Sequence, residues 1–309
     1  MSYCIPSPTV DAMEVRSNAE RFSGFADLYD RVRPTPPDVL AEILCTYAGT
    51  DQPAVVDLGS GTGLSTRWAS GWARSVVGVE PSEDMRRVAE AQTVDAAVTY
   101  VDGWAHATGL PAESADLVLA SQALHWMEPT STLAEVARLL RPGGVFAAID
   151  CDFPPSVGSA RAEAAFHACR ARVKAYDDRL AAGLRGEELH EPLGGEVPTL
   201  PPEFVRDAPA GRVRSVGVTS WSKDEHLARF IASGHFRWCR EIESLRVDEG
   251  DAERFVAVLL SQGDFQTLKK HGVDEAMVGV PEFEAAVHAA LGDGTRPFWW
   301  SYRTRMGVK

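Results

Sequence analysis

A glycine-rich segment holds the residues of this chain best suited to bind a ligand. An apolar run over residues 55–58 leads directly into glycines at every second position, and a helical pattern follows from residue 64; the glycines are Gly59, Gly61 and Gly63. Glycine tolerates positive φ and lets a ligand lie against bare backbone, while the amides at a helix start bind anionic or polar groups. A nucleotide-like ligand is therefore expected here, with a purely structural turn as the alternative.

Two acidic residues flank this loop at positions that narrow the ligand. Asp57 precedes the glycines, and Glu80 ends the next apolar run, at the edge where open α/β sheets bind ligands. A carboxylate at Glu80 can accept hydrogen bonds from both hydroxyls of a ribose. A dinucleotide fingerprint, Gly-x-Gly-x-x-Gly, would require a glycine at position 64, where this chain has Leu64.

Two further groups of residues could act on a second ligand. Gln122, His125 and Trp126 follow an apolar run over 115–120, and they could donate to a substrate oxygen, serve as a base and exclude water respectively. Tyr29 and Arg33 are four residues apart and would share one face of a helix. For His125 and for the Tyr29 and Arg33 pair, an ordinary structural role is the alternative.

Short apolar runs alternate with helical patterns from residue 38 to 150, which predicts βαβ units and a parallel sheet. Beyond residue 150, one long helix is expected over 160–184, a proline-rich linker over 192–211, and strands over 212–221 and 297–306. Helical patterns at 223–232, 251–260 and 281–291 indicate a helical insertion. Aromatic and basic residues of this insertion include Trp221, His235, Arg237 and Trp238. They could bind an anionic or flat substrate, and the alternative is that they only pack the helical cap.

Composition limits the class of partner. Charged residues make up 24% of the 309 positions and hydrophobic ones 45%, as in ordinary globular proteins. The net charge of −13 argues against nucleic acid and anionic membranes as partners. The five cysteines are scattered without a Cys-x-x-Cys pair, so neither a disulfide framework nor a metal site is expected. No signal peptide or membrane span is recognisable, and a cytoplasmic location is expected.

Taken in order along the chain, these motifs resemble the class I S-adenosylmethionine-dependent methyltransferases over roughly residues 20–150. The matching segments are the glycine loop after Asp57, the turns Val79-Glu80-Pro81-Ser82 and Val101-Asp102, the strand Ala115-Asp116-Leu117-Val118 and the turn Leu139-Leu140-Arg141-Pro142-Gly143-Gly144. Residues 25–37 and 121–126 are similar to the small-molecule branch that includes trans-aconitate methyltransferase. A longer spacing after Asp102 departs from the family pattern and leaves Trp104 without an assigned place.

The resemblance implies S-adenosylmethionine as the cofactor and assigns residues to it. The implied cofactor-binding residues are Tyr29, Arg33, Asp57, Gly59, Ser60, Gly61, Gly63, Glu80, Pro81, Met85, Asp102, Gly103 and Ser121. Glu80 would hold the ribose, Asp102 and Met85 the adenine, and Arg33 the methionine carboxylate. Gln122 and His125 would be catalytic, and the substrate would contact Trp126, Trp221, His235, Arg237 and Trp238.

The fold implied is an α/β, Rossmann-like, seven-stranded, mostly parallel sheet with an antiparallel C-terminal strand pair and a helical cap insertion. We expect an N-terminal helical lid over 1–37, the cofactor-binding core over 38–220, the insertion over 221–296 and the last strand over 297–309. The expected reaction is methyl transfer to a small-molecule acceptor, most simply at a carboxylate or hydroxyl oxygen.

Three alternatives remain. C- or N-methylation of a quinone-like or natural-product substrate is one, and a non-catalytic binding or regulatory protein of the same fold is another. A nicotinamide dehydrogenase is disfavoured, because none of the six tyrosines is followed by lysine four residues later.

Overall fold

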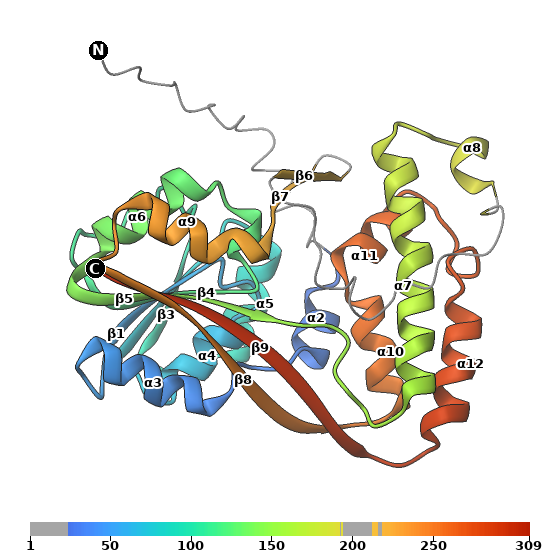
Figure 1. The fold of residues 1–309 in the computed structure, drawn as a ribbon, viewed down its shortest axis with the longest axis horizontal. Coiled ribbons are helices and arrows are strands. Elements are labelled where there is room, and N and C mark those ends of the chain that lie inside the picture. The colour runs from blue at the N-terminus through green and yellow to red at the C-terminus, as the bar shows by residue number, and fades with distance from the viewer. Residues whose placement is uncertain (1–23, 192, 194–211, 216–217) are drawn as a thin grey trace.

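The computed structural model describes residues 24–191, 193, 212–215 and 218–309. Its centre is a seven-stranded sheet of order β3-β2-β1-β4-β5-β9-β8, in which the first five strands are parallel and the last two antiparallel (Figure 1). The strands are β1 Ala54–Leu58, β2 Ser75–Val79, β3 Val98–Val101, β4 Ala115–Ser121, β5 Leu140–Cys151, β8 Trp238–Gly250 and β9 Arg296–Val308. The predicted sheet, with its antiparallel C-terminal pair, is confirmed.

Helices cover both faces of the parallel strands, which is why those strands are apolar on both sides. The N-terminal half has α2 Ala26–Val32, α3 Asp38–Ala48, α4 Leu64–Ser70, α5 Glu83–Gln92, the 3₁₀ turn η1 Leu124–Trp126 and α6 Pro129–Leu139. Ser82 caps α5 by accepting a hydrogen bond from the Met85 amide at 3.4 Å, as its position before the helix predicts. Register is regular: Val55 of β1 pairs with Val76 of β2 and with Leu117 of β4.

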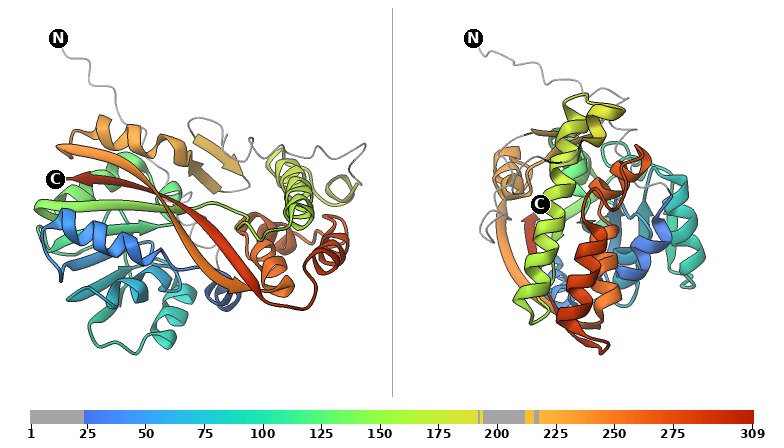
Figure 2. Two further views of the ribbon diagram at one scale, coloured as in Figure 1. Left: turned by 60° about the horizontal axis from the view of Figure 1, so that its bottom comes forward. Right: turned by 90° about the vertical axis from the view of Figure 1, so that its right-hand side faces the viewer.

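A second group of helices gathers beyond one end of the sheet, where the long strands β8 and β9 reach out to it (Figures 1 and 2). Its members are α7 Ala160–Ala181, α8 Glu187–His190, α10 Ala252–Leu260, α11 Gly263–Lys270 and α12 Val280–Leu291. Phe166, Phe255 and Phe283 pack against one another in its interior and belong to the same apolar core as β1, β4 and β5. This group contacts α2, since the Arg33 side chain bonds to Ser261 just after α10. The lid predicted over 1–37 stays a prediction, because residues 1–23 lie outside the described residues.

Two expectations for the C-terminal half are wrong. The segment 212–221 does not join the main sheet; it forms a separate antiparallel hairpin of β6 Arg212–Ser215 and β7 Val218–Trp221. The partner of β9 is instead β8, which lies inside the segment expected to be wholly helical over 221–296. That segment continues from β7 through the 3₁₀ turn η3 Lys223–Glu225 and the helix α9 His226–Ser233 into β8.

The charge pattern of β8 explains why it escapes recognition. It is an edge strand that pairs with β9 on one side, and five of its residues are charged in the stretch 240–248: Arg240, Glu241, Glu243, Arg246 and Asp248. Charges on an edge strand protect it from pairing with other chains, and they also mask its apolar alternation. The predicted long helix over 160–184 is confirmed as α7, and the predicted linker over 192–211 lies outside the described residues except for residue 193. Within the part of the chain described, no helix is long and apolar enough to cross a bilayer.

Candidate active site

A pocket lies at the carboxyl ends of the parallel strands, and most of the predicted cofactor residues line it. The predicted residues found in its wall are Tyr29, Arg33, Gly59, Ser60, Gly61, Glu80, Pro81, Met85, Ser121, Gln122 and Trp126. The strand order puts Glu80 after β2, the glycine loop after β1, Gln122 after β4 and Cys151 at the end of β5. With neighbouring strands ~4.8 Å apart, the pocket therefore runs ~14 Å along the sheet edge from Glu80 to Cys151.

The glycine loop has the conformation that its sequence predicts. Gly59, Gly61 and Gly63 all have positive φ, at 64°, 56° and 84°. A Cβ at Gly59 would lie 2.8 Å from both Ala123 Cβ and Met127 Cε, so only glycine lets this turn pack against the wall after β4. Gly63 does not line the pocket; it begins α4 and leaves room for Tyr100, whose hydroxyl would be 2.3 Å from an added Cβ.

Glu80 is tied to the loop that it faces. Its carboxylate accepts hydrogen bonds from the Gly61 amide at 3.0 Å and from the Ser82 amide at 2.9 Å. Burial raises the pKa of Glu80 to about 6 although these amides and Arg86 favour the ionised form. The group is therefore ionised at neutral pH and held rigidly at the pocket wall, as a ribose-binding carboxylate must be.

Asp57 lies beneath the loop instead of in the pocket wall. One carboxylate oxygen accepts hydrogen bonds from the hydroxyls of Ser65 and Thr66, both at 2.7 Å, which holds the first turn of α4. The other oxygen is buried without a partner among the described residues. Burial raises the pKa of Asp57 to about 6 despite the two hydroxyl donors. Its predicted contact with the cofactor stays a prediction.

The pKa of Asp57 makes the stability of the protein depend on pH. Between about pH 4 and 6 the folded state keeps a proton that the unfolded chain has lost, so stability falls as pH rises, by up to about 3 kcal/mol for this group. Glu80 acts in the same direction. Asp57→Asn should flatten the fall, as measured by urea unfolding at pH 4, 5, 6 and 7. Asp116→Asn is the matched control, because hydrogen bonds from the Ala54 amide and the Arg141 guanidinium outweigh burial and lower the pKa of Asp116. A pH profile of Asp57→Asn that runs parallel to that of the wild type would contradict the raised pKa of Asp57.

Asp102, the acid predicted to bind adenine, does not lie in the pocket wall. The Asp102 side chain is 73% exposed and pairs with Arg86 at 3.2 Å, and neither Asp102 nor Gly103 lines the pocket. The extended loop after β3 instead brings Trp104, Ala105 and His106 into the pocket wall, near Pro81 and Met85. The longer spacing after Asp102 was the visible signal for this difference, and it supplies an aromatic wall where a carboxylate was expected.

Several pocket residues were not predicted. Cys151 ends β5 and Phe153 follows it, Thr62 belongs to the glycine loop, and Met127 follows η1. Burial raises the pKa of the Cys151 thiol to about 12, so it stays protonated at neutral pH. The rule that picked out Glu80, a polar residue at the carboxyl end of a parallel strand, also applies to the end of β5 and could have identified this wall.

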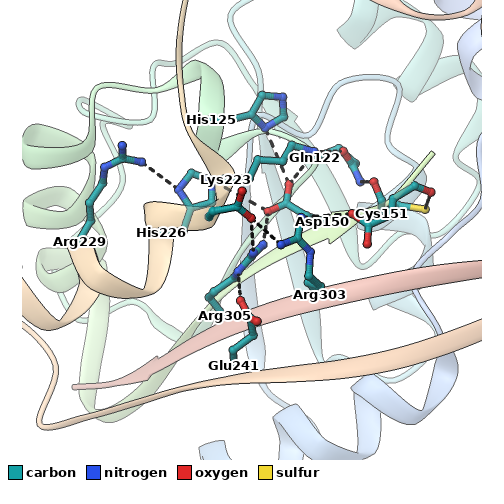
Figure 3. Close-up of polar contacts among 12 residues, drawn as sticks. Gln122, His125, Asp150, Cys151, Lys223, His226, Arg229, Glu241, Arg303 and Arg305 are labelled. Atoms are coloured by element: carbon teal, nitrogen blue, oxygen red, sulfur yellow. Dashed lines mark hydrogen bonds and ion pairs between the residues drawn. The ribbon is translucent and has the colours of Figure 1, made fainter. Parts of the chain in front are cut away.

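His125 does not line the pocket. It faces the buried carboxylate of Asp150, with Nδ1 3.9 Å from Asp150 Oδ1 (Figure 3). Its ring lies 4.5 Å from that of Trp126. Asp150, near the end of β5, also contacts Lys223 and Arg305. A catalytic role for His125 therefore stays a prediction.

Three of the predicted substrate residues lie at the wrong edge of the sheet. Trp238 pairs with Val308, which pairs with Val145 near the start of β5, whereas the pocket lies at the other end of that strand. Six residues of strand separate Val145 from Cys151, a distance of ~20 Å. His235 and Arg237 precede Trp238 and are exposed, and Trp238 stacks on Tyr47 at 4.9 Å. The prediction failed because 235–240 was taken as part of the helical cap.

Trp221 is nearer to the pocket. It ends β7, which lies against η1, and it is half-buried beside the turn that carries Lys223. It does not line the pocket, and a contact with substrate stays a prediction.

Buried polar atoms in the pocket indicate that a ligand belongs there. Ser60 Oγ and Thr62 Oγ1 are buried without a hydrogen-bond partner among the described residues, and both residues line the pocket. The Arg33 guanidinium also lines it; among the described residues it donates to Ser261 Oγ and to the Ser261 carbonyl, both at 3.0 Å, and it lies over the rings of Phe153 and Tyr29 at 4.3 and 4.9 Å. Hydroxyls, the Glu80 carboxylate, the Arg33 guanidinium and apolar walls fit the ribose, carboxylate and adenine of S-adenosylmethionine.

Comparisons with known proteins agree with this geometry. Residues 56–148 match the family model described as a methyltransferase domain. The yeast Saccharomyces cerevisiae protein named "Probable S-adenosylmethionine-dependent methyltransferase CRG1" is 30% identical over 125 residues, or 38% of this chain and 43% of the relative. The uncharacterised methyltransferase Rv3342 of Mycobacterium tuberculosis is 36% identical over 124 residues, 40% of this chain and 49% of the relative. The chain thus spans about half the length of these curated relatives.

Solved structures share the fold over most of the chain. A protein from Anabaena variabilis assigned to the methyltransferases of an antibiotic biosynthesis pathway aligns with a TM-score of 0.53 at 17% identity, covering 91% of this chain and 99% of its own. A protein of Anaeromyxobacter dehalogenans assigned as a type II methyltransferase aligns with a TM-score of 0.51 at 24% identity, covering 89% and 97%. Residues 56–148 thus match a methyltransferase domain, and the yeast relative is named for its dependence on S-adenosylmethionine.

Proposed function

We propose that the protein transfers the methyl group of S-adenosylmethionine to a small-molecule acceptor, at an oxygen. The observation that carries the proposal is the single pocket that continues from Glu80 and the glycine loop to Gln122, Cys151 and Phe153. A cofactor bound over β2 and β1 fills one end of it. The other end, over β4 and β5, is left for the acceptor.

The cofactor end has residues for each part of S-adenosylmethionine, which supplies a methyl group on a sulfonium that an acceptor can attack in line. Glu80 would accept from the ribose hydroxyls, and Arg33 would pair with the carboxylate in bidentate geometry. Met85, Pro81 and Trp104 would enclose the adenine. These contacts fix the donor relative to β4, and positioning of this kind can contribute ~7–11 kcal/mol to methyl transfer.

The acceptor end favours an acceptor that is already ionised. Its walls are aromatic at Trp126 and Phe153, and the Gln122 amide is a neutral donor. The Cys151 thiol, with a pKa of about 12, cannot take a proton at neutral pH. His125 faces Asp150 and does not line the pocket. The Glu128 carboxylate, which lines the pocket, accepts hydrogen bonds from the Thr130 and Ser131 amides. A carboxylate needs no base, whereas a phenol, an amine or a carbon acid does. The acceptor we favour is therefore a small carboxylate with an apolar body.

The ribose assignment is tested by Glu80→Ala. The variant loses a hydrogen bond to an ionised acceptor, worth ~1.5–3 kcal/mol, so the affinity for S-adenosylmethionine in calorimetry should fall ~10–150-fold. Glu83→Ala, an exposed glutamate in the first turn of α5, is the control and should bind like wild type. An unchanged affinity in Glu80→Ala refutes the assignment.

The acceptor is identified by incubating the protein with methyl-labelled S-adenosylmethionine and a small-molecule extract of cells. Mass spectrometry should find label in one acid or a few related acids, as esters. Label on nitrogen or carbon would support the alternative acceptor classes. Binding of S-adenosylmethionine without any labelled product would point to a non-catalytic protein.

A further inference from the structure

A cluster of charges surrounds the buried Asp150, next to Gln122 and Cys151 of the pocket wall (Figure 3). The Asp150 carboxylate is 2% exposed; it lies 3.0 Å from Lys223 Nζ and 2.8 Å from Arg305 Nη1. Two histidines, His125 and His226, flank it at 3.9 and 4.0 Å. Burial raises the pKa of Asp150, but Lys223, the histidines and Arg305 outweigh it and hold the pKa below its usual value. Asp150 is therefore a fixed negative charge that holds Lys223.

Gln122 joins this cluster to the pocket. Lys223 Nζ donates to Gln122 Oε1 at 2.8 Å, and Gln122 Nε2 donates to the Cys151 carbonyl at 3.0 Å. An ammonium has only donors and a carbonyl has only acceptors, so chemistry alone fixes which end of the amide is which. The Gln122 oxygen is engaged by Lys223, and of the two amide hydrogens one remains after the bond to Cys151.

The backbone of Gln122 is also held in one conformation. Its φ is 54°, a left-handed conformation that is uncommon outside glycine, and its amide donates to the Ile149 carbonyl at 2.8 Å. The side chain therefore starts from a fixed point between β4 and β5, with a lysine on one side and a backbone carbonyl on the other.

Lys223 is anchored on both sides along the chain. The preceding residue, Ser222, accepts a hydrogen bond at its carbonyl from Arg229 Nη1 at 2.8 Å, and the following residue, Asp224, pairs with Arg303 Nη1 at 2.6 Å. Its side chain is 26% exposed, so its ammonium is partly shielded from water. The turn η3 thus delivers a positioned donor to the back of the pocket wall.

We infer that Lys223 is a positioning residue that holds Gln122 with an N–H, and not its oxygen, toward the methyl acceptor. The inference rests on the proposed function and narrows its substrate. An N–H donor at this place stabilises a substrate that offers a hydrogen-bond-accepting oxygen, such as a carboxylate or carbonyl. It leaves an ammonium or amide N–H of a substrate facing another donor, which costs the pairing energy of both groups. Lys223, which does not line the pocket itself, thus favours oxygen acceptors over nitrogen acceptors through its hydrogen bond to Gln122.

The variant Lys223→Met tests this role. Methionine retains an apolar stem, and Asp150 keeps Arg305 as its partner, so the buried carboxylate is not left unpaired. The Gln122 amide becomes free to rotate. We expect the yield of labelled products from the extract to fall ~10-fold, the loss of about one hydrogen bond, while the affinity for S-adenosylmethionine changes less than twofold. Lys223→Arg, which keeps a donor, should recover most of the yield.

The control is Lys174→Met, which removes an exposed lysine of α7 that pairs with Asp178. It should match wild type in both measurements. If Lys223→Met lowers the affinity for S-adenosylmethionine as much as it lowers the product yield, the residue supports the fold alone and the inference is overturned.

A second readout does not depend on turnover. In ¹⁵N-labelled protein, the Gln122 side-chain amide is the pair of signals missing from Gln122→Glu. These signals should keep their positions in Lys223→Arg and move in Lys223→Met, with faster hydrogen exchange. Unmoved signals in Lys223→Met overturn the inference. Failure of the wild-type protein to bind S-adenosylmethionine would refute the proposed function and leave this test of the Lys223 contact in place.

Discussion

Replacement of Asp150 by alanine is expected to lower the free energy of unfolding by about 3–5 kcal/mol. The variant removes a carboxylate between Lys223 and Arg305, and the Arg305 side chain is 1% exposed. The buried Arg305 would keep the Glu241 carboxylate, but it and the partly buried Lys223 would lose the carboxylate that lies between them, which is the costly way to break a buried ion pair. Urea unfolding monitored by circular dichroism gives the value.

The matched control is Asp178→Ala. Asp178 also pairs with a lysine, Lys174 at 3.0 Å, but both side chains are more than half exposed. Surface pairs of this kind contribute about 0–1 kcal/mol. Equal losses in Asp150→Ala and Asp178→Ala would show that the buried cluster does not stabilise the fold as described.

The substitution Gly63→Ala is expected to cost about 2–5 kcal/mol of stability. Gly63 has a φ of 84°, and for alanine the left-handed conformation costs ~1–2 kcal/mol. The added Cβ would lie 2.3 Å from the Tyr100 hydroxyl and force that ring to move, at a further ~1–3 kcal/mol. The same movement disturbs the start of α4, so we also expect weaker binding of S-adenosylmethionine.

The double variant Gly63→Ala with Tyr100→Phe separates the two causes. Removal of the hydroxyl relieves the clash but leaves the backbone conformation unchanged. The double variant should therefore lose at least ~1 kcal/mol less stability than the sum of the losses in the two single variants. Tyr100→Phe alone loses the hydrogen bond between its hydroxyl and Thr93 Oγ1 at 2.9 Å. Strictly additive losses would contradict the clash. Gly61→Ala is a useful comparison, because an added Cβ there would meet nothing within 4 Å.

The cofactor half of the fold could be predicted from local patterns. Each parallel strand is a short apolar run, and each loop at its carboxyl end has a residue type that its position requires, as at Gly59, Gly61 and Glu80. The C-terminal half could not be predicted in the same way. The edge strand β8 has charged residues where an apolar alternation would identify a strand. In the β-branched segment 212–221, β6 and β7 pair with each other and not with the main sheet.

The site shows the same division. The residues predicted at the ends of β1, β2 and β4 line the pocket wall, whereas Asp102 after β3, His125 and Trp238 do not. Asp102 precedes a loop of unusual length, and Trp238 begins the strand β8 in a segment predicted as helical. His125 faces Asp150, which belongs to a different strand. Lys223 and Asp150 are 73 positions apart, and no local pattern indicates that they meet. Long-range ion pairs of this kind are visible only once the sheet order is known.

Isothermal titration calorimetry with S-adenosylmethionine tests the central claim most directly. The account predicts binding at one molecule per chain in the wild-type protein, retained in Glu83→Ala and weakened ~10–150-fold in Glu80→Ala. No detectable binding by the folded wild-type protein would contradict it.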